Sequence, residues 1–143
     1  MAEGFLRSYE QLKVYSAGTH PAEKVHPNAV KVMKEIGIDL ASYKPKLVDE
    51  FIQESFDYII TVCDNAKENC PVFIGDVKHR LHIGFEDPAE AKGTEEEILE
   101  VFTTVRDQIK KRMDEFYVEK VIGKIPVHVK SLWFSIYLRR VYQ

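Results

Sequence analysis

The sequence predicts an α/β fold of three layers, in which helices flank a small parallel sheet. Segments with helical periodicity alternate along the chain with short apolar segments rich in β-branched residues, an order of elements typical of layered α/β proteins. The apolar segment at residues 56–63 is nearly continuous, as expected for a strand buried on both faces of a parallel sheet. A length of 143 residues favours a single domain.

The first part of the chain predicts three helices and a short strand. Residues 1–12 predict a helix, because their apolar side chains recur at intervals of three or four. Residues 13–16 are a strand candidate. The next helix begins at Pro27, a favourable first helical residue, and Gly37 is suited to end it. A shorter helix is expected over residues 46–53.

The second part of the chain predicts two strands and a long helix. The strand at residues 56–63 is followed by a weaker candidate at residues 80–85, where apolar and polar side chains partly alternate. The helix at residues 94–117 begins with Thr94 and Glu97, which have the spacing of a capping box. Its apolar residues recur at helical spacing and form a core-facing stripe: Ile98, Val101, Phe102, Val105, Ile109, Met113 and Phe116.

Composition and charge favour a cytoplasmic protein. The formal net charge of -3 argues against nucleic-acid binding, for which a basic face is usual. No apolar run approaches the roughly 18 residues of a membrane span, and no basic-then-apolar leader opens the chain. In a reducing compartment, a close pair such as Cys63 and Cys70 is more often catalytic, redox-active or metal-binding than a structural disulfide.

Several short motifs carry the chemical information in the sequence. They are, in order, MAEGF (1–5), VYSAG (14–18), TVC (61–63), CP (70–71), GFEDPA (84–89), GT (93–94) and VRD (105–107). In this order and at this spacing, residues 1–117 resemble the thioredoxin-coupled arsenate reductases of the low-molecular-weight tyrosine phosphatase family. The cysteine pair followed by Asp-Pro separates this branch from plain tyrosine phosphatases of the same fold.

The resemblance implies one phosphatase-like domain at residues 1–117 that reduces arsenate to arsenite. In the family, a loop with a Cys, five residues and an Arg holds the arsenate or another phosphate-like oxyanion and supplies the nucleophile. Asp87 would protonate the departing oxygen. Cys63 would attack the Cys–arsenic adduct, and Cys70 would then form a Cys63–Cys70 disulfide for thioredoxin to reduce.

The nucleophile loop is the part of the family pattern that these residues do not contain. In relatives the loop immediately precedes the residues that match Met1 to Gly4, and the first, central strand of the sheet precedes the loop. We therefore expect the sheet to lack that strand. We also expect negligible arsenate reduction by the chain as given, because positioned electrostatics usually supply several kcal/mol of catalysis, and family activity for a version extended upstream.

Other interpretations of the same residues stay open. One is a low-molecular-weight phosphatase-like hydrolase that does not need Cys63 or Cys70, and another is a non-catalytic remnant that binds thioredoxin. Taken singly, Cys63 is compatible with a buried inert thiol and Asp87 with a turn before proline. A zinc site would combine both cysteines with His79 and His82, although this spacing is not a common zinc pattern.

The resemblance implies no tightly bound cofactor, but it suggests a binding site for a monovalent cation. Glu3 and Ser16 match positions that line a cation site beside the nucleophile loop in some relatives. Lys46 stands where several relatives have Asp, so its ammonium group could replace the cation or simply be solvated.

Residues 118–143 fall outside the resemblance and form a basic, aromatic tail of unknown role. The simplest interpretation is an appended element that covers exposed core and could even fill the place of the missing strand. Attachment to a membrane surface is less favoured, and disorder is a further alternative.

Overall fold

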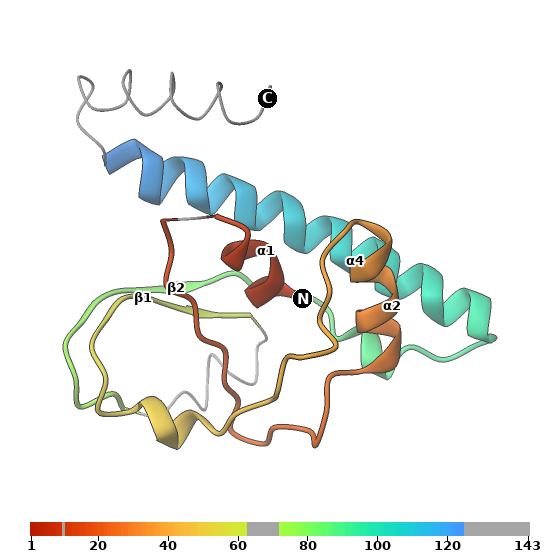
Figure 1. Cartoon of the computed structure of the whole chain (residues 1–143), viewed down its shortest axis with the longest axis horizontal. Helices are drawn as coiled ribbons and strands as arrows, with labels where there is room; N and C mark the ends of the chain where they lie inside the picture. Colours follow the sequence, from red (N-terminus) through yellow and green to blue (C-terminus); the bar gives the residue numbers. More distant parts are fainter. Residues whose placement is uncertain (10, 63–71, 125–143) are drawn as a thin grey trace.

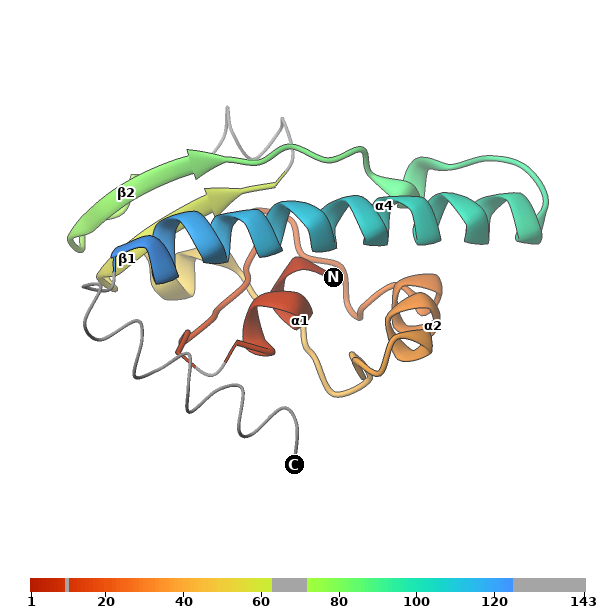
Figure 2. The ribbon, with the colours of Figure 1, turned by 90° about the horizontal axis from the view of Figure 1, so that it is seen from above.

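The computed structural model describes residues 1–9, 11–62 and 72–124, which form an α/β arrangement around one long helix. The helices are α1 (Ala2–Arg7), α2 (Pro27–Glu35) and α4 (Glu95–Phe116), and the strands are β1 (Phe56–Thr61) and β2 (Val77–His82). Short 3-10 helices at Val48–Phe51, Pro88–Glu90 and Ile122–Lys124 and a π-helical turn at Tyr117–Val121 accompany them. The helix α4 runs along the molecule (Figure 1), and in Figure 2 the strands lie on one side of it and α1 and α2 on the other.

β1 and β2 form a parallel sheet, which confirms the predicted α/β class and the strand direction. The register runs from Phe56 opposite Val77 to Thr61 opposite His82. The second strand therefore begins three residues earlier than the candidate at residues 80–85. The reason is that the strand starts where its backbone meets β1 in register, and not where its side chains begin to alternate.

The C-terminal end of α2 is closed as its sequence predicts. Gly37 has a φ of 84° and donates its N–H to the carbonyl of Lys34 at 3.0 Å. Ile38 donates to the carbonyl of Met33 at 3.0 Å. This pair of bonds is a Schellman motif, which needs a left-handed residue that glycine adopts without steric cost.

The predicted long helix is confirmed as α4. Thr94 and Glu97 form the capping box, with the Glu97 carboxylate accepting from the Thr94 N–H at 2.8 Å and the Thr94 hydroxyl from the Glu97 N–H at 3.2 Å. The apolar stripe along one face of α4 packs against α1 and α2 in the core. The buried residues of the helix are Phe102, Val105, Arg106, Ile109, Met113 and Phe116.

α1 is shorter than the predicted helix at residues 1–12, because the chain after Arg7 is held against the end of α4. The ring of Tyr9 stacks on Tyr117 with centroids 3.9 Å apart, and its hydroxyl donates to Asp114. Partial burial acts to raise the pKa of Asp114, but the hydrogen bonds from Lys110 and Tyr9 outweigh it and leave the pKa below its ordinary value.

Two other expected elements take a different form. The strand prediction for residues 13–16 is wrong, since these residues belong to no strand, and an isolated parallel bridge joins Gly18 to Leu47 nearby. The helix expected at residues 46–53 is the short 3-10 helix Val48–Phe51.

The predicted tail begins as a continuation of α4. Residues 117–124 follow it as π-helical and 3-10 turns, and residues 125–143 lie outside the described residues. Within the ranges that the structure describes, no helix combines the length and apolar character needed to cross a membrane.

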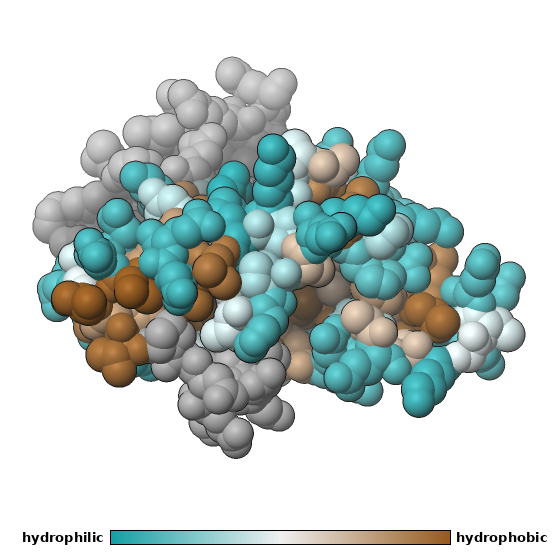
Figure 3. All heavy atoms as spheres, turned by 90° about the horizontal axis from the view of Figure 1, so that it is seen from below, coloured by the Kyte–Doolittle hydropathy of each residue, from teal (hydrophilic) through white to brown (hydrophobic). Residues whose placement is uncertain are grey.

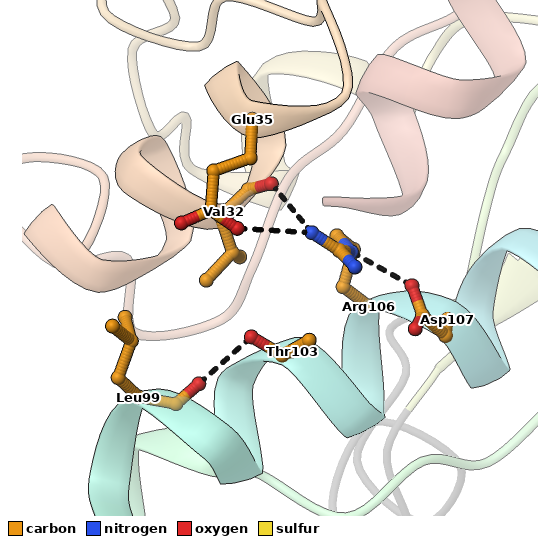
Figure 4. Close-up of polar contacts among 6 residues, drawn as sticks. All are labelled: Val32, Glu35, Leu99, Thr103, Arg106 and Asp107. Atoms are coloured by element: carbon orange, nitrogen blue, oxygen red, sulfur yellow. Dashed lines mark hydrogen bonds and ion pairs between the residues drawn. The ribbon is translucent and has the colours of Figure 1, made fainter. Parts of the chain in front are cut away.

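Arg106 places a charge in the apolar face of α4 and ties this helix to α2 (Figure 4). The residue is 8% exposed, and its Nη1 donates to the carbonyl oxygen of Val32 at 2.9 Å. This carbonyl belongs to the last turn of α2, where carbonyls need partners from outside the helix. Glu35 at 3.3 Å and Asp107 at 2.8 Å complete the ion pairs of the guanidinium.

We predict that Arg106→Met lowers the free energy of unfolding by about 2 kcal/mol, because it leaves the Val32 carbonyl buried without its donor. Urea unfolding followed by circular dichroism measures the change. The matched control is Arg112→Met, which removes an exposed pair with Glu115 at 2.9 Å and should cost less than about 0.5 kcal/mol. Equal losses in the two variants would contradict the assignment.

Candidate functional site

The carboxyl ends of β1 and β2 form the edge at which two predicted catalytic segments meet. The N–H of Phe85 donates to the carbonyl of Val62 at 3.0 Å, so the segment after β2 runs beside the end of β1. Val62 is the residue before Cys63, and Asp87 follows Phe85 by two residues. In open parallel sheets, ligands bind outside this edge. Cys63 and Cys70 themselves lie outside the described residues.

Asp87 is exposed and holds a local turn. Its carboxylate accepts a hydrogen bond from the N–H of Ala89 at 2.9 Å and caps the 3-10 helix Pro88–Glu90. The turn that the Asp-Pro sequence predicts is therefore present. Its acid role stays a prediction.

His79 and His82 do not share a face of the sheet. They are three residues apart on β2, and successive side chains of a strand alternate between faces. His79 stacks on Tyr58 with ring centroids 4.9 Å apart, whereas His82 Nδ1 lies 2.9 Å from the hydroxyl of Thr61. Among the described residues, no three His, Cys, Asp or Glu side chains are grouped to hold a metal ion. The zinc alternative therefore gains no support from this part of the chain.

Glu3, on α1, is a buried carboxylate with a relative exposure of 9%. Arg7 Nη2 lies 2.8 Å from its Oε1, and the hydroxyl of Ser16 donates to its Oε2. The structure thus brings together Glu3 and Ser16, the two residues predicted to line a cation site. It adds Arg7, which sequence reasoning missed, although the Glu–Arg spacing of four residues on a helix was a usable signal.

Arg7 has two further contacts that fix its guanidinium. Nη2 donates to the carbonyl of Val14 at 3.3 Å, and the guanidinium carbon lies 5.1 Å from the centre of the Tyr43 ring. Lys46 approaches the same region through its backbone, because its carbonyl accepts from the N–H of Gly18 at 3.0 Å. Gly18 follows Ser16 by two residues.

Gly4 allows α1 to approach the core closely enough to bury Glu3. A Cβ at this position would lie within contact distance of three side chains, at 2.9 Å from Leu40, 3.1 Å from Ile38 and 3.2 Å from Met33. The next residue, Phe5, is 3% exposed and packs in the same core. The position of Glu3 therefore depends on a glycine beside it.

An open hollow beside α4 is not suited to an oxyanion. It is lined by Glu86, Glu97, Glu100, Val101, Thr104, Val105 and Gln108. Three carboxylates there would repel arsenate or phosphate.

Exposed apolar side chains follow the segment that contains the cysteines. Val72 is 84% exposed and Ile74 is 76% exposed. The N–H of Ile74 donates to the carbonyl of Ile52 at 2.7 Å, which holds this segment beside the residues that lead into β1. On the face drawn in Figure 3, exposed apolar residues gather toward one end of a largely polar surface. Such groups suit contact with another protein.

Known sequences resemble this chain over most of its length. The low molecular weight phosphotyrosine protein phosphatase family matches residues 1–125. An arsenate reductase of Bacillus subtilis (strain 168) is 46% identical over 118 residues, which cover 81% of this chain and 84% of that protein. An arsenate reductase of Halalkalibacterium halodurans is 45% identical over 118 residues, with the same 81% and 84% covered.

Solved structures show the same similarity in three dimensions. An arsenate reductase in the oxidized state superimposes with a TM-score of 0.65 and 30% identity, and 87% of each chain is covered. An arsenate reductase in the phosphate binding state superimposes with a TM-score of 0.67 and 28% identity, covering 82% of this chain and 86% of that chain.

We predict that Gly4→Ala lowers the free energy of unfolding by about 1–3 kcal/mol, even though alanine is the better helix former. The added methyl group would meet Leu40 at 2.9 Å and push α1 away from the core. Gly18→Ala is the control, because the atoms nearest to its added Cβ are 4.0 Å away. Urea unfolding of both variants tests the prediction, which fails if Gly4→Ala costs no more than Gly18→Ala.

Proposed function

The chain belongs to the low molecular weight phosphotyrosine protein phosphatase family. On this basis we propose that its function is the reduction of arsenate to arsenite with electrons from thioredoxin. The observation that carries the proposal is the 46% identity to an arsenate reductase, extending over 81% of this chain and 84% of that protein. Binding of an oxyanion is supported by the similarity to an arsenate reductase in the phosphate binding state, with a TM-score of 0.67.

The proposed reaction is a relay of thiols that ends in a disulfide. A thiolate in a Cys-x5-Arg loop bonds to arsenic, and Asp87 protonates the oxygen that leaves as water. The thiolate of Cys63 attacks the sulfur of this adduct, so arsenic takes up two electrons and leaves as arsenite while a disulfide forms. Cys70 then attacks that disulfide, frees the first thiol and forms the Cys63–Cys70 bond.

The proposal is supported by the edge of the sheet at which the relay would operate. The hydrogen bond from Phe85 to Val62 at 3.0 Å holds the segment leading to Asp87 beside the end of β1. Because Cys63 follows Val62 directly, the acid and the second thiol would reach the same edge.

We propose thioredoxin as the reductant because exposed apolar side chains follow the segment that contains Cys63 and Cys70. Val72, two residues after Cys70, is 84% exposed, and Ile74 is 76% exposed. These exposed apolar side chains are suited to contact with a protein partner that brings its own thiol to the disulfide.

Arsenate reduction by these 143 residues depends on a source of the first thiolate. A Cys-x5-Arg sequence does not occur in the 143 residues, since Asn69 and Asp76 stand six residues after the two cysteines. We therefore propose that these 143 residues alone have negligible turnover. A version extended upstream by a strand and a Cys-x5-Arg loop would be active.

We predict arsenate-dependent oxidation of NADPH, in the presence of thioredoxin and thioredoxin reductase, by the extended version and not by the 143-residue chain. In the extended version, Cys63→Ser should abolish turnover because arsenite can no longer be displaced. Turnover by the 143-residue chain that Cys63→Ser removes would refute the proposed inactivity and require another nucleophile.

A phosphatase of the same family is the second candidate, and the match of residues 1–125 to a family of phosphotyrosine protein phosphatases favours it. It would hydrolyse aryl phosphates and would be indifferent to Cys63→Ser and Cys70→Ser. A stable mixed disulfide with thioredoxin and no turnover in the extended version would instead favour a binding role.

We predict that Asp87→Asn in the extended version lowers kcat by roughly 10²- to 10⁴-fold without unfolding the turn. In the unmodified chain the N–H of Ala89 donates to the Asp87 carboxylate at 2.9 Å. Asparagine can still accept this hydrogen bond, but it cannot supply the proton. Steady-state kinetics and the melting temperature separate the two roles. Glu90→Gln, in the same 3-10 helix, is the control, and an equal loss of kcat in it would contradict an acid role for Asp87.

A further inference from the structure

The Glu3 carboxylate already has a partner at each of its oxygens. Arg7 Nη2 lies 2.8 Å from Oε1, and the Ser16 hydroxyl donates to Oε2. The Glu3 side chain is 8% exposed, so little water can replace either partner. A buried carboxylate is stable only when such partners compensate its lost hydration.

These contacts do not fit a site for a sodium or potassium ion. A fixed positive charge repels a metal cation, and one carboxylate oxygen here faces the guanidinium of Arg7 at 2.8 Å. The nearby segment adds Lys46, whose carbonyl binds Gly18 at 3.0 Å, and a lysine offers no anionic ligand.

We propose that the guanidinium of Arg7 is itself the cation of this site, so that this chain neither binds nor needs a monovalent ion at Glu3. Arg7 suits this role because its planar fork reaches several partners at once. It contacts Glu3 at 2.8 Å and the carbonyl of Val14 at 3.3 Å, and it lies over the ring of Tyr43 at 5.1 Å. The charge is thus fixed between three segments of the chain.

The first test compares melting temperatures of the unmodified chain in potassium chloride, sodium chloride and choline chloride at equal ionic strength. Equal ionic strength removes the general screening effect of salt. We expect the three values to agree within about 1 °C, since an ion bound only by the folded state would raise the melting temperature in proportion to its occupancy. A saturable rise in potassium or sodium over choline would overturn the proposal.

The second test asks whether Arg7 acts through the charge of Glu3. Arg7→Gln should lower the melting temperature by about 4 °C or more, because it leaves a buried carboxylate without its counter-charge. The double variant Glu3→Gln with Arg7→Gln should melt closer to the unmodified chain than Arg7→Gln alone, a coupling that lost packing would not produce. Arg112→Gln is the control for removal of an arginine from an exposed pair.

The outcomes of the second test are decisive in either direction. If Arg7→Gln does not fold and the double variant does, the orphaned carboxylate is again the cause and the proposal stands. A double variant that is no more stable than Arg7→Gln, or an Arg7→Gln loss no larger than that of Arg112→Gln, would overturn it. All readouts are unfolding temperatures, so a failed arsenate assay would bear on the proposed function and not on this inference.

Discussion

Burial of one face of α4 is the interaction on which the rest of the structure depends. Phe102 is 2% exposed and Met113 is fully buried, and the stripe to which they belong packs against α1 and α2. Each large apolar side chain removed from water contributes roughly 1.5–3 kcal/mol, so a helix of 22 residues with such a stripe can organise its neighbours. The six residues of α1 would not form a helix alone, and they do so because Phe5 enters the same core.

The described core contains two buried charged residues, Glu3 and Arg106, and each is compensated by a different kind of partner. Arg106 meets a helix-terminal carbonyl at 2.9 Å and two carboxylates that are largely exposed. Glu3 meets a guanidinium and a hydroxyl from neighbouring segments. Among the described residues, no buried side-chain polar atom lacks a partner, so neither charge strains the core.

The edge of the sheet at which the candidate catalytic segments meet depends on the parallel register of β1 and β2. Because both strands end on the same side, Val62 and the segment through Phe85 meet there at a backbone distance of 3.0 Å. An antiparallel pair would have placed the segment before Cys63 and the Asp-Pro turn at opposite ends of the strands.

Much of the fold was predictable because its strongest signals are local. The capping box of Thr94 and Glu97 and the glycine that ends α2 act within a few residues. The run of apolar residues that forms β1 predicted a parallel sheet by its composition alone. The family resemblance rests on motifs that are equally visible in the sequence, and the match over residues 1–125 confirms membership of the low molecular weight phosphatase family.

The sequence by itself determined the end of α2, the start of α4 and its core-facing stripe, the strand β1 and the family, because each is encoded in a short-range pattern. Tertiary structure alone decided that residues 13–16 stay outside the sheet, that β2 begins at Val77, and that α1 ends at Arg7. It also decided that Glu3 is buried against Arg7. These outcomes depend on partners distant in the chain, such as the Tyr9–Tyr117 stack, and the free energy of such contacts exists only once the core has formed.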